Sequence, residues 1–152
     1  MSPLHIVLVE PQIPPNAGNV ARLCAAMKLT LHLVGPLGFS TEDRYLKRAG
    51  LDYWPYVDWH VYSSWAEFLK SHGEGRHYYL TTKSKKSYTD VLYQKGDYLI
   101  FGSETKGLSE DIRKGGGENT ITIPMKESGV RSLNLSSAVA MVAGEALRQI
   151  TL

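Results

Sequence analysis

Asn16, Arg22, Glu104 and Asn134 are the side chains in this sequence whose types and placement favour chemistry on a bound substrate. An arginine guanidinium suits a phosphate, because its paired N–H donors match the phosphate oxygens. Ligands of an open parallel sheet collect at the carboxyl ends of its strands. The four residues belong to three polar segments that each follow a predicted strand, namely residues 16–22, 101–108 and 123–136. They therefore predict a single site at one edge of a sheet.

Each segment also has a purely structural explanation. Asn16 is a possible helix N-cap, with Arg22 as a solvated charge, and Asn134 or Ser136 could cap the last helix. The glycines around Glu104 could form an ordinary turn. They match neither the phosphate loop nor the dinucleotide fingerprint, because the required glycine spacings are absent. Only the three segments together favour a functional site.

Short apolar runs alternate with amphipathic stretches along the whole sequence. Such alternation is typical of a parallel α/β sheet flanked by helices. We therefore expect an α/β fold with an open parallel sheet, and a single domain spanning residues 1–152. The expected strands are 4–9, 29–34, 57–62, 77–82, 98–102 and 121–124, and the expected helices are 16–28, 41–50, 64–73, 109–115 and 136–150.

The first expected helix positions part of the site. Its buried stripe is expected to consist of Val20, Leu23, Cys24 and Met27, which follow the i, i+3, i+4, i+7 spacing. Gly18, Asn19 and Arg22 then lie on the opposite side. In the helix 64–73, the predicted inward side chains are Trp65, Phe68 and Leu69.

The composition excludes several classes of protein. Cys24 is the single cysteine, so neither an intramolecular disulfide nor a four-cysteine zinc site can form. The sequence has neither a signal peptide nor an apolar run that could span a membrane, so we expect a cytoplasmic protein. A net charge of +2 from 17 basic and 15 acidic residues does not reveal a nucleic-acid partner. The histidines lack metal-ligand spacing, and we assign no metal and no role to His5, His32, His60, His72 and His77.

Taken in order, the three segments resemble the motifs of the SPOUT superfamily of S-adenosylmethionine-dependent RNA methyltransferases. The residues 6–19 (IVLVEPQIPPNAGN), 22–25 (RLCA), 48–54 (RAGLDYW) and 80–83 (LTTK) resemble its TrmL (YibK) group in particular. The resemblance covers essentially the whole chain. Lys106 stands where the family often has arginine, and Leu133 where it often has methionine.

This resemblance implies a C-terminal trefoil knot, which the connection rules for ordinary folds would not suggest. It implies a homodimer through the first and last helices, with the second subunit helping to complete the RNA site. It also implies a cofactor, S-adenosylmethionine, with S-adenosylhomocysteine as the product. The cofactor pocket would then be lined by Leu80, Gly102, Gly107, Ile123, Met125, Ser132 and Leu133.

The implied reaction is methylation of the ribose 2′-hydroxyl of the wobble nucleotide (position 34) of tRNA. Arg22 is expected to be essential, with Asn16 and Asn134 holding the same site and Glu104 organising the cofactor loop. An arginine is a poor general base because its pKa lies above about 12. Expected contacts to RNA are Lys83, Lys85, Lys86, Tyr88, Arg44, Lys47, Arg48 and Arg131.

Other functions stay open at this point. The same chemistry could act on another RNA, such as a ribosomal RNA ribose. A non-catalytic RNA-binding module of the same fold is a second alternative, although Arg22, Glu104 and Asn134 are all present. A flavodoxin-like nucleotide-binding domain is the third alternative.

Overall fold

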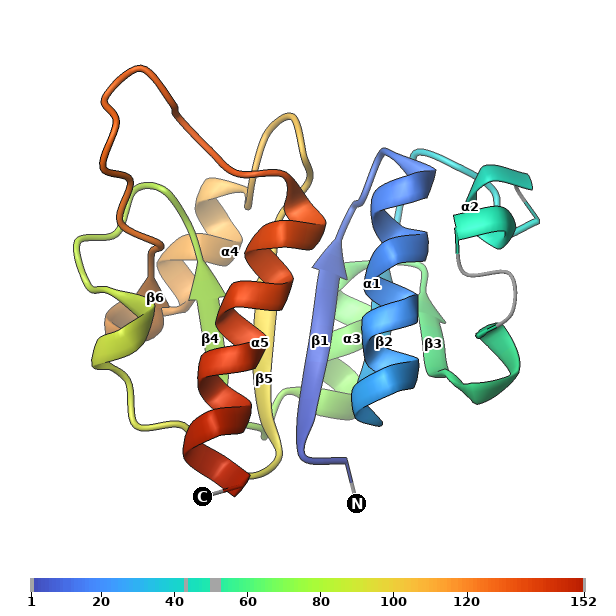
Figure 1. Ribbon diagram of the computed structural model, residues 1–152, viewed down its shortest axis with the longest axis horizontal. Helices are drawn as coiled ribbons and strands as arrows, with labels where there is room; N and C mark the ends of the chain where they lie inside the picture. Colours follow the sequence, from blue (N-terminus) through green and yellow to red (C-terminus); the bar gives the residue numbers. More distant parts are fainter. Residues whose placement is uncertain (1, 43, 50–52, 152) are drawn as a thin grey trace.

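A single parallel sheet forms the centre of the molecule in the computed structural model, which describes residues 2–42, 44–49 and 53–151. The sheet has six strands in the order β3-β2-β1-β5-β4-β6, and all neighbouring strands pair in parallel. Their carboxyl ends lie together at the top of Figure 1. The strands are β1 (Leu4–Val9), β2 (Thr30–Val34), β3 (Asp58–Tyr62), β4 (His77–Leu80), β5 (Asp97–Phe101) and β6 (Thr120–Ile121). The predicted α/β class with an open parallel sheet is confirmed.

Helices cover both faces of this sheet (Figure 1). On one face, α1 and α5 pack side by side over Leu4, Ile6 and Leu8 of β1. On the other face, Phe68 of α3 and Ile112 of α4 pack over Val7 and other residues of the sheet. The helices are α1 (Pro14–Met27), α2 (Arg44–Ala49), α3 (Trp65–His72), α4 (Glu110–Gly115) and α5 (Leu135–Thr151). Because both faces are covered, the central strands are buried and mostly apolar.

The first helix starts earlier than expected. Pro14 and Pro15 occupy its first turn and Ile13 is the N-cap, so Asn16 lies inside the helix and is not its cap. Proline is favoured there, because its fixed φ suits a helix and its missing N–H would have had no partner within the helix.

The predicted buried stripe of α1 is also partly wrong. Val20 and Cys24 are buried as expected, but Met27, the last residue of the helix, is 48% exposed. Gly18 is buried, while Asn19 and Arg22 are exposed. The polar side of α1 is therefore narrower than the sequence suggested.

The helix α3 follows its predicted pattern closely. The Ser64 side chain accepts a hydrogen bond from the Glu67 N–H, as a capping box requires. Phe68 is fully buried, but Leu69 is 38% exposed and does not point inward as expected. The helix expected at 41–50 is shorter, since α2 begins at Arg44, and Gly50 lies outside the described residues.

The last strand lies inside an earlier loop of the chain. β6 pairs with Tyr79 and Leu80 of β4 on one side. On the other side, the Thr122 N–H donates to the Lys86 carbonyl, and the Tyr88 N–H donates to the Thr122 carbonyl. Both arms of the loop 81–88 therefore hold the strand, and the chain leaves from between them to reach α5. This is the region of the C-terminal knot that the resemblance implied.

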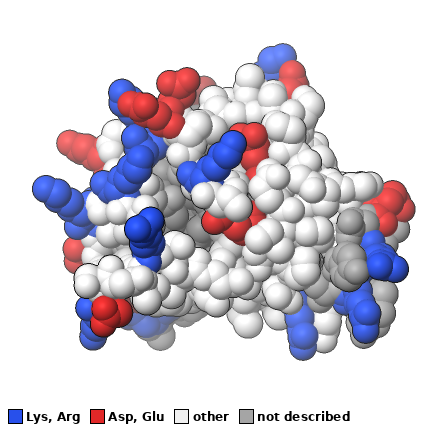
Figure 2. Space-filling model, turned by 90° about the horizontal axis from the view of Figure 1, so that it is seen from above, with Lys and Arg blue, Asp and Glu red and all other residues white. Residues whose placement is uncertain are grey.

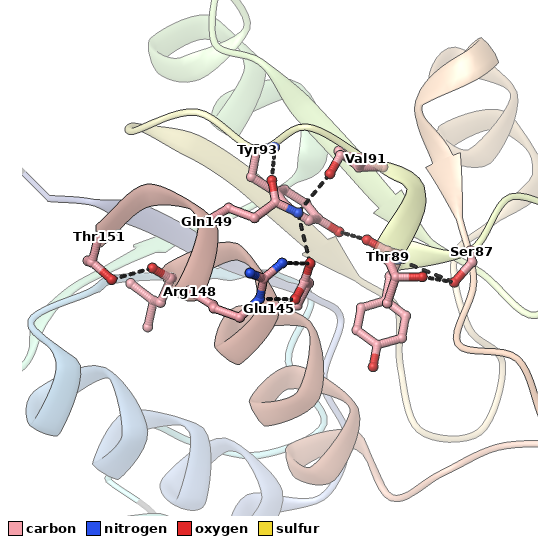
Figure 3. Close-up of polar contacts among 10 residues, drawn as sticks. Ser87, Thr89, Val91, Tyr93, Glu145, Arg148, Gln149 and Thr151 are labelled. Carbon is pink, nitrogen blue, oxygen red and sulfur yellow. Dashed lines mark hydrogen bonds and ion pairs between the residues drawn. The ribbon is translucent and has the colours of Figure 1, made fainter.

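The far end of α5 is fastened to the same connection between β4 and β5 (Figure 3). The Gln149 carboxamide accepts a hydrogen bond from the Tyr93 N–H at 2.9 Å and donates to the Val91 carbonyl at 2.9 Å. It also donates to Glu145, which Arg148 holds with two hydrogen bonds. Hydrogen bonds from Arg148 and Gln149 lower the pKa of Glu145 to about 2. No described helix is long and apolar enough to cross a membrane.

Candidate active site

A pocket of about 400 Å³ opens at the carboxyl ends of β4, β5 and β6. Its walls come from segments that are distant in sequence: the end of β4, the turn after β5, and the connection from β6 to α5. All seven residues that the sequence predicted for the cofactor line this single pocket: Leu80, Gly102, Gly107, Ile123, Met125, Ser132 and Leu133. The glycine-containing turn after β5 and the connection that contains Ser132 thus meet at this pocket, as expected.

The turn after β5 is tightly folded. A side chain at Gly102 would collide with the backbone of Gly107 and Leu108. Gly107 has a φ of +68°, in the left-handed region that favours glycine, and its N–H donates to the Ser103 carbonyl at 2.9 Å. The Lys106 N–H donates to the Ser103 hydroxyl. These contacts form a compact pocket wall in which backbone atoms are close to any bound ligand.

Glu104 lies between this turn and the start of α1. One carboxylate oxygen accepts a hydrogen bond from the Gln12 N–H, and the other accepts from the Ile13 N–H, both at 2.8 Å. The second oxygen also accepts from the Asn16 side chain at 3.2 Å. A carboxylate is favourable beside these N–H groups at the helix start. Glu104 therefore positions the first motif relative to the second.

Asn16 and Asn134 extend the same network to the third motif. The Asn134 Nδ2 donates to the Asn16 Oδ1 at 3.0 Å. The Asn134 Oδ1 accepts from the Ser136 N–H and the Ser137 N–H, so Asn134 caps α5. Ser136 additionally donates its hydroxyl to the same oxygen. All three motifs are consequently joined by side-chain hydrogen bonds beside the pocket.

Arg22 is placed differently from the other predicted residues. Its guanidinium lies 4.9 Å from the centre of the Tyr53 ring, on the exposed side of α1. It does not line the pocket of its own chain. Tyr53 follows residues 50–52, which lie outside the described part, and sequence reasoning gave it no role. Its place within the segment 48–54, which the family resemblance singled out, was the available signal.

The predicted RNA-binding residues fall into two groups. Lys83 and Arg131 line the pocket, while Lys85 and Lys86 lie exposed in the segment that holds β6. Arg44 and Arg48 lie on α2, on the other side of α1, and the Lys47 side chain lies outside what the structure describes. Figure 2 looks onto the carboxyl ends of the strands and shows basic side chains gathered over the β4–β6 side.

Two basic residues of the pocket escaped sequence reasoning. Lys106 lies in the turn after β5, and Arg113 extends from α4 into the lining. With Lys83 and Arg131 they outnumber Glu104, the single acidic residue of the lining, whose oxygens already accept the hydrogen bonds described above. The pocket mouth therefore favours an anionic partner such as a phosphate. Lys106 was within reach of sequence reasoning because it follows Glu104 in the same motif.

The site and fold together define a class of protein, the RNA methyltransferases with a knotted SPOUT-type α/β fold. Residues 3–144 match the SpoU rRNA Methylase family, and the chain belongs to that family. The resemblance stated from the three motifs is confirmed at this level.

Known proteins are similar to this chain over nearly its full length. The chain is 45% identical over 148 residues to the tRNA (cytidine(34)-2′-O)-methyltransferase of Escherichia coli K12, covering 97% of this chain and 94% of that protein. A solved structure concerned with 2-OH methylation of C/U34 on tRNA is 46% identical, with a TM-score of 0.92 and coverage of 97% and 96%. The SpoU methyltransferase AviRb of Streptomyces viridochromogenes, solved with AdoMet, shares the fold at 21% identity, with a TM-score of 0.86 and coverage of 98% and 61%.

The described residues contain no group of three or more histidine, cysteine, aspartate or glutamate side chains arranged to hold a metal ion.

Proposed function

We propose that this protein transfers the methyl group of S-adenosylmethionine to the ribose 2′-hydroxyl of nucleotide 34 of tRNA, the wobble position. The observation that carries this proposal is the single pocket lined by the second and third motifs, to which hydrogen bonds of Glu104, Asn16 and Asn134 join the first motif. It is supported by the E. coli relative, which matches across the pocket-forming segments. We expect the enzyme to act in the cytoplasm.

The pocket suits the proposed cofactor. Its volume of about 400 Å³ lies within the range of small-ligand sites. Apolar side chains of Leu80, Ile123 and Leu133 could cover an adenine ring, while the tight turn at Gly102 and Gly107 offers backbone donors and acceptors. Bound S-adenosylmethionine supplies a methyl group on a sulfonium, which is a good leaving group.

The chain's own contribution is mainly alignment. The ribose oxygen must approach the methyl carbon opposite the sulfur at about 3–3.5 Å, and the 2′-hydroxyl proton must leave as the bond forms. Glu104 is a poor candidate for the proton acceptor, because both its oxygens already accept hydrogen bonds from the start of α1. We assign Glu104, Asn16 and Asn134 to positioning the pocket walls.

Arg22 is proposed to hold a phosphate of the substrate and to stabilise negative charge on the 2′-oxygen. Because Arg22 does not line its own pocket, this role requires a homodimer in which the arginine reaches the site of the other subunit. The proposed dimer uses α1 and α5, whose exposed sides carry Met27 at 48% and Met141 at 42% exposure. Small exposed residues of α5, Ala140 and Gly144, would allow close helix contact. Analytical ultracentrifugation at micromolar concentration tests this dimer, and a monomer would contradict it.

The tRNA backbone is proposed to contact the basic residues of the pocket mouth and the 83–86 segment. Phosphate contacts make binding sensitive to salt, with a slope that grows with the number of contacts. Charge reversal at Lys83, Lys85 and Lys86 should weaken tRNA binding and lower this slope. The same reversal at Arg44 and Arg48 tests whether the second group contributes. Unchanged affinity and slope would exclude the residues concerned.

Nucleoside mapping tests the function directly. The purified protein is incubated with labelled S-adenosylmethionine and total tRNA from a strain that lacks the enzyme, and the methylated position is identified by mass spectrometry. We expect a 2′-O-methyl group at nucleotide 34. Ribosomal RNA is the matched alternative substrate, and methylation of that RNA alone would favour the alternative reaction.

A further inference from the structure

The five histidines, which lie far apart in sequence, gather on the α3 side of the sheet. Each comes from a different element: His5 from β1, His32 from β2, His60 from β3, His72 from α3 and His77 from β4. His5 and His77 lie at the amino ends of β1 and β4, and His32 and His60 lie in the middle of β2 and β3, whereas the pocket lies at the carboxyl ends of β4, β5 and β6. Sequence reasoning assigned these residues no role, but the parallel register of the strands brings them close together in space.

A continuous chain of hydrogen bonds joins three of these histidines through two tyrosines. The His5 Nδ1 lies 2.9 Å from the His32 Nε2, and the His32 Nδ1 lies 2.9 Å from the Tyr62 hydroxyl. That hydroxyl lies 2.9 Å from the His72 Nε2, and the His72 Nδ1 lies 2.8 Å from the Tyr98 hydroxyl. We call these five residues the histidine–tyrosine chain. It fastens α3, through its last residue, to β1, β2, β3 and β5.

All four contacts of the histidine–tyrosine chain can be hydrogen bonds when its imidazoles are neutral. Each contact needs one hydrogen, and neutral rings and hydroxyls can supply one hydrogen per contact in either direction along the chain. His5 and His32 cannot both carry an extra proton, because two N–H groups would then face each other at 2.9 Å. Simultaneous protonation of His32 and His72 would leave the Tyr62 hydroxyl hydrogen without an acceptor in the chain. The network therefore has little capacity for added protons.

The surroundings also disfavour positive charge. His32 is 1% exposed, and the rings of Phe68, His5 and His72 surround it. Desolvation, with smaller effects from neighbouring histidines, lowers the pKa of His32 to about 3. Desolvation and His72 lower the pKa of His5 to about 4. Burial also lowers the pKa of His72 and of His77.

The other titratable groups on this face do not offset that effect. Asp58 of β3 raises the pKa of His5, but this effect is smaller than the lowering by desolvation and by His72, and its carboxylate also pairs with the exposed His60 and accepts from Thr30. His77 of β4 contacts the His72 carbonyl and the Tyr79 hydroxyl. The charged residues Glu67 and Lys70 of α3 pair with each other on its exposed side.

We propose that the histidine–tyrosine chain is an acid-sensitive fastening, which holds α3 on the sheet at neutral pH and releases it in mildly acidic solution when His5 and His32 take up protons. The inference does not depend on the proposed methyl transfer. It concerns the face of the sheet opposite α1 and α5, and local opening of one element can precede global unfolding.

Proton linkage determines whether the attachment of α3 strengthens or weakens as the pH falls. An unfolded or released histidine titrates near its ordinary pKa of about 6.5, whereas the folded values lie lower. The stabilisation is therefore fully present above about pH 6.5 and is lost as the pH falls from there toward about 4. Within this window, each histidine that is protonated only after release makes release about tenfold easier per pH unit.

Hydrogen exchange on the full-length protein tests the proposal. Exchange of residues 65–72 is measured at pH 7 and pH 5 and corrected for intrinsic rates, with β1 as the internal reference. From pH 7 to pH 5 we expect protection of 65–72 to fall by about 20-fold for one histidine, and by more if both take up protons. β1 should lose less. Unchanged protection of 65–72 would overturn the proposal.

Two variants distinguish the effect of the histidine–tyrosine chain from a general loss of stability in acid. His5→Asn keeps a side-chain atom near the position of Nδ1 but cannot be protonated, so it should reduce the pH effect by about 20-fold. His60→Gln removes an exposed histidine outside the hydrogen-bonded chain; its ring stacks on His32 and it is only a minor cause of the lowered pKa of His5 and His32, so this variant should retain most of the pH effect. Equal pH dependence in both variants would contradict the proposal. Imidazole ¹⁵N spectra of the wild-type protein provide an independent measurement, and His5 or His32 titrating near pH 6.5 in the folded state would also contradict it.

Discussion

Asn16 and Asn134 are 118 positions apart in the sequence, yet their side chains are joined by a hydrogen bond of 3.0 Å. The bond connects the first turn of α1 to the first turn of α5 beside the pocket. Asn16 is 7% exposed, so its carboxamide needs partners within the protein. Glu104 supplies one partner and Asn134 supplies the other. This arrangement supports the proposed role of both asparagines, which is to hold the pocket walls in place.

Asn134→Ala should therefore affect both stability and cofactor binding. The substitution removes the cap of α5, which typically costs about 1 kcal/mol, and leaves the buried Asn16 Oδ1 without its partner. Chemical denaturation measures the first effect, and calorimetric titration with S-adenosylmethionine measures the second. Asn19→Ala is the matched control, because Asn19 is exposed on the same helix as Asn16. Wild-type cofactor affinity in Asn134→Ala would show that the hydrogen bond does not shape the pocket.

Much of the architecture was predictable because local signals agree with the fold. Apolar runs marked the strands, and the capping box at Ser64 correctly marked the start of α3. The family resemblance implied the residues that line the pocket. The role of Asn16 was misread, since a proline pair just before it is itself a start signal, with the first turn beginning at Pro14.

Features that depend on strand register could not be predicted in the same way. His32 and His60 lie opposite each other only because β2 pairs with β3 in one particular register. Met27 is the last residue of α1 and is 48% exposed, although helical periodicity alone would place it with the buried residues. Arg113 enters the pocket because α4 packs beside β6 and the knot, and no local pattern marks it.

Gly102→Ala should weaken cofactor binding through backbone displacement. An added methyl group would collide with the Gly107 and Leu108 backbone, so the turn must move away from β5. We expect S-adenosylmethionine affinity to fall by at least about tenfold, since a shift of the turn changes the pocket wall. Gly115→Ala is the control, because a methyl group there meets no atom within 4 Å. Calorimetric titration compares the two, and equal affinities would contradict the assignment of this turn.

Arg22→Ala should abolish methylation while cofactor binding survives. The guanidinium lies on Tyr53 and outside the pocket of its own chain, so its removal leaves the lining intact. Arg22→Lys keeps the charge but loses the planar fork, and it should recover only a small part of the activity. Single-turnover assays measure methyl transfer, and calorimetry measures cofactor affinity. Loss of cofactor affinity in Arg22→Ala would overturn this separation of roles.

Gln149→Ala should loosen the fastening between α5 and the connection that encloses β6. The substitution leaves the Val91 carbonyl and the Tyr93 N–H without their partner (Figure 3). An unpaired polar group of this kind costs about 1–3 kcal/mol, which denaturant unfolding can measure. Arg148→Ala provides the control on the preceding residue, because the Arg148 side chain is 60% exposed and its ion pair with Glu145 should contribute less than about 1 kcal/mol. If both variants lose the same stability, the carboxamide of Gln149 does not fasten this connection.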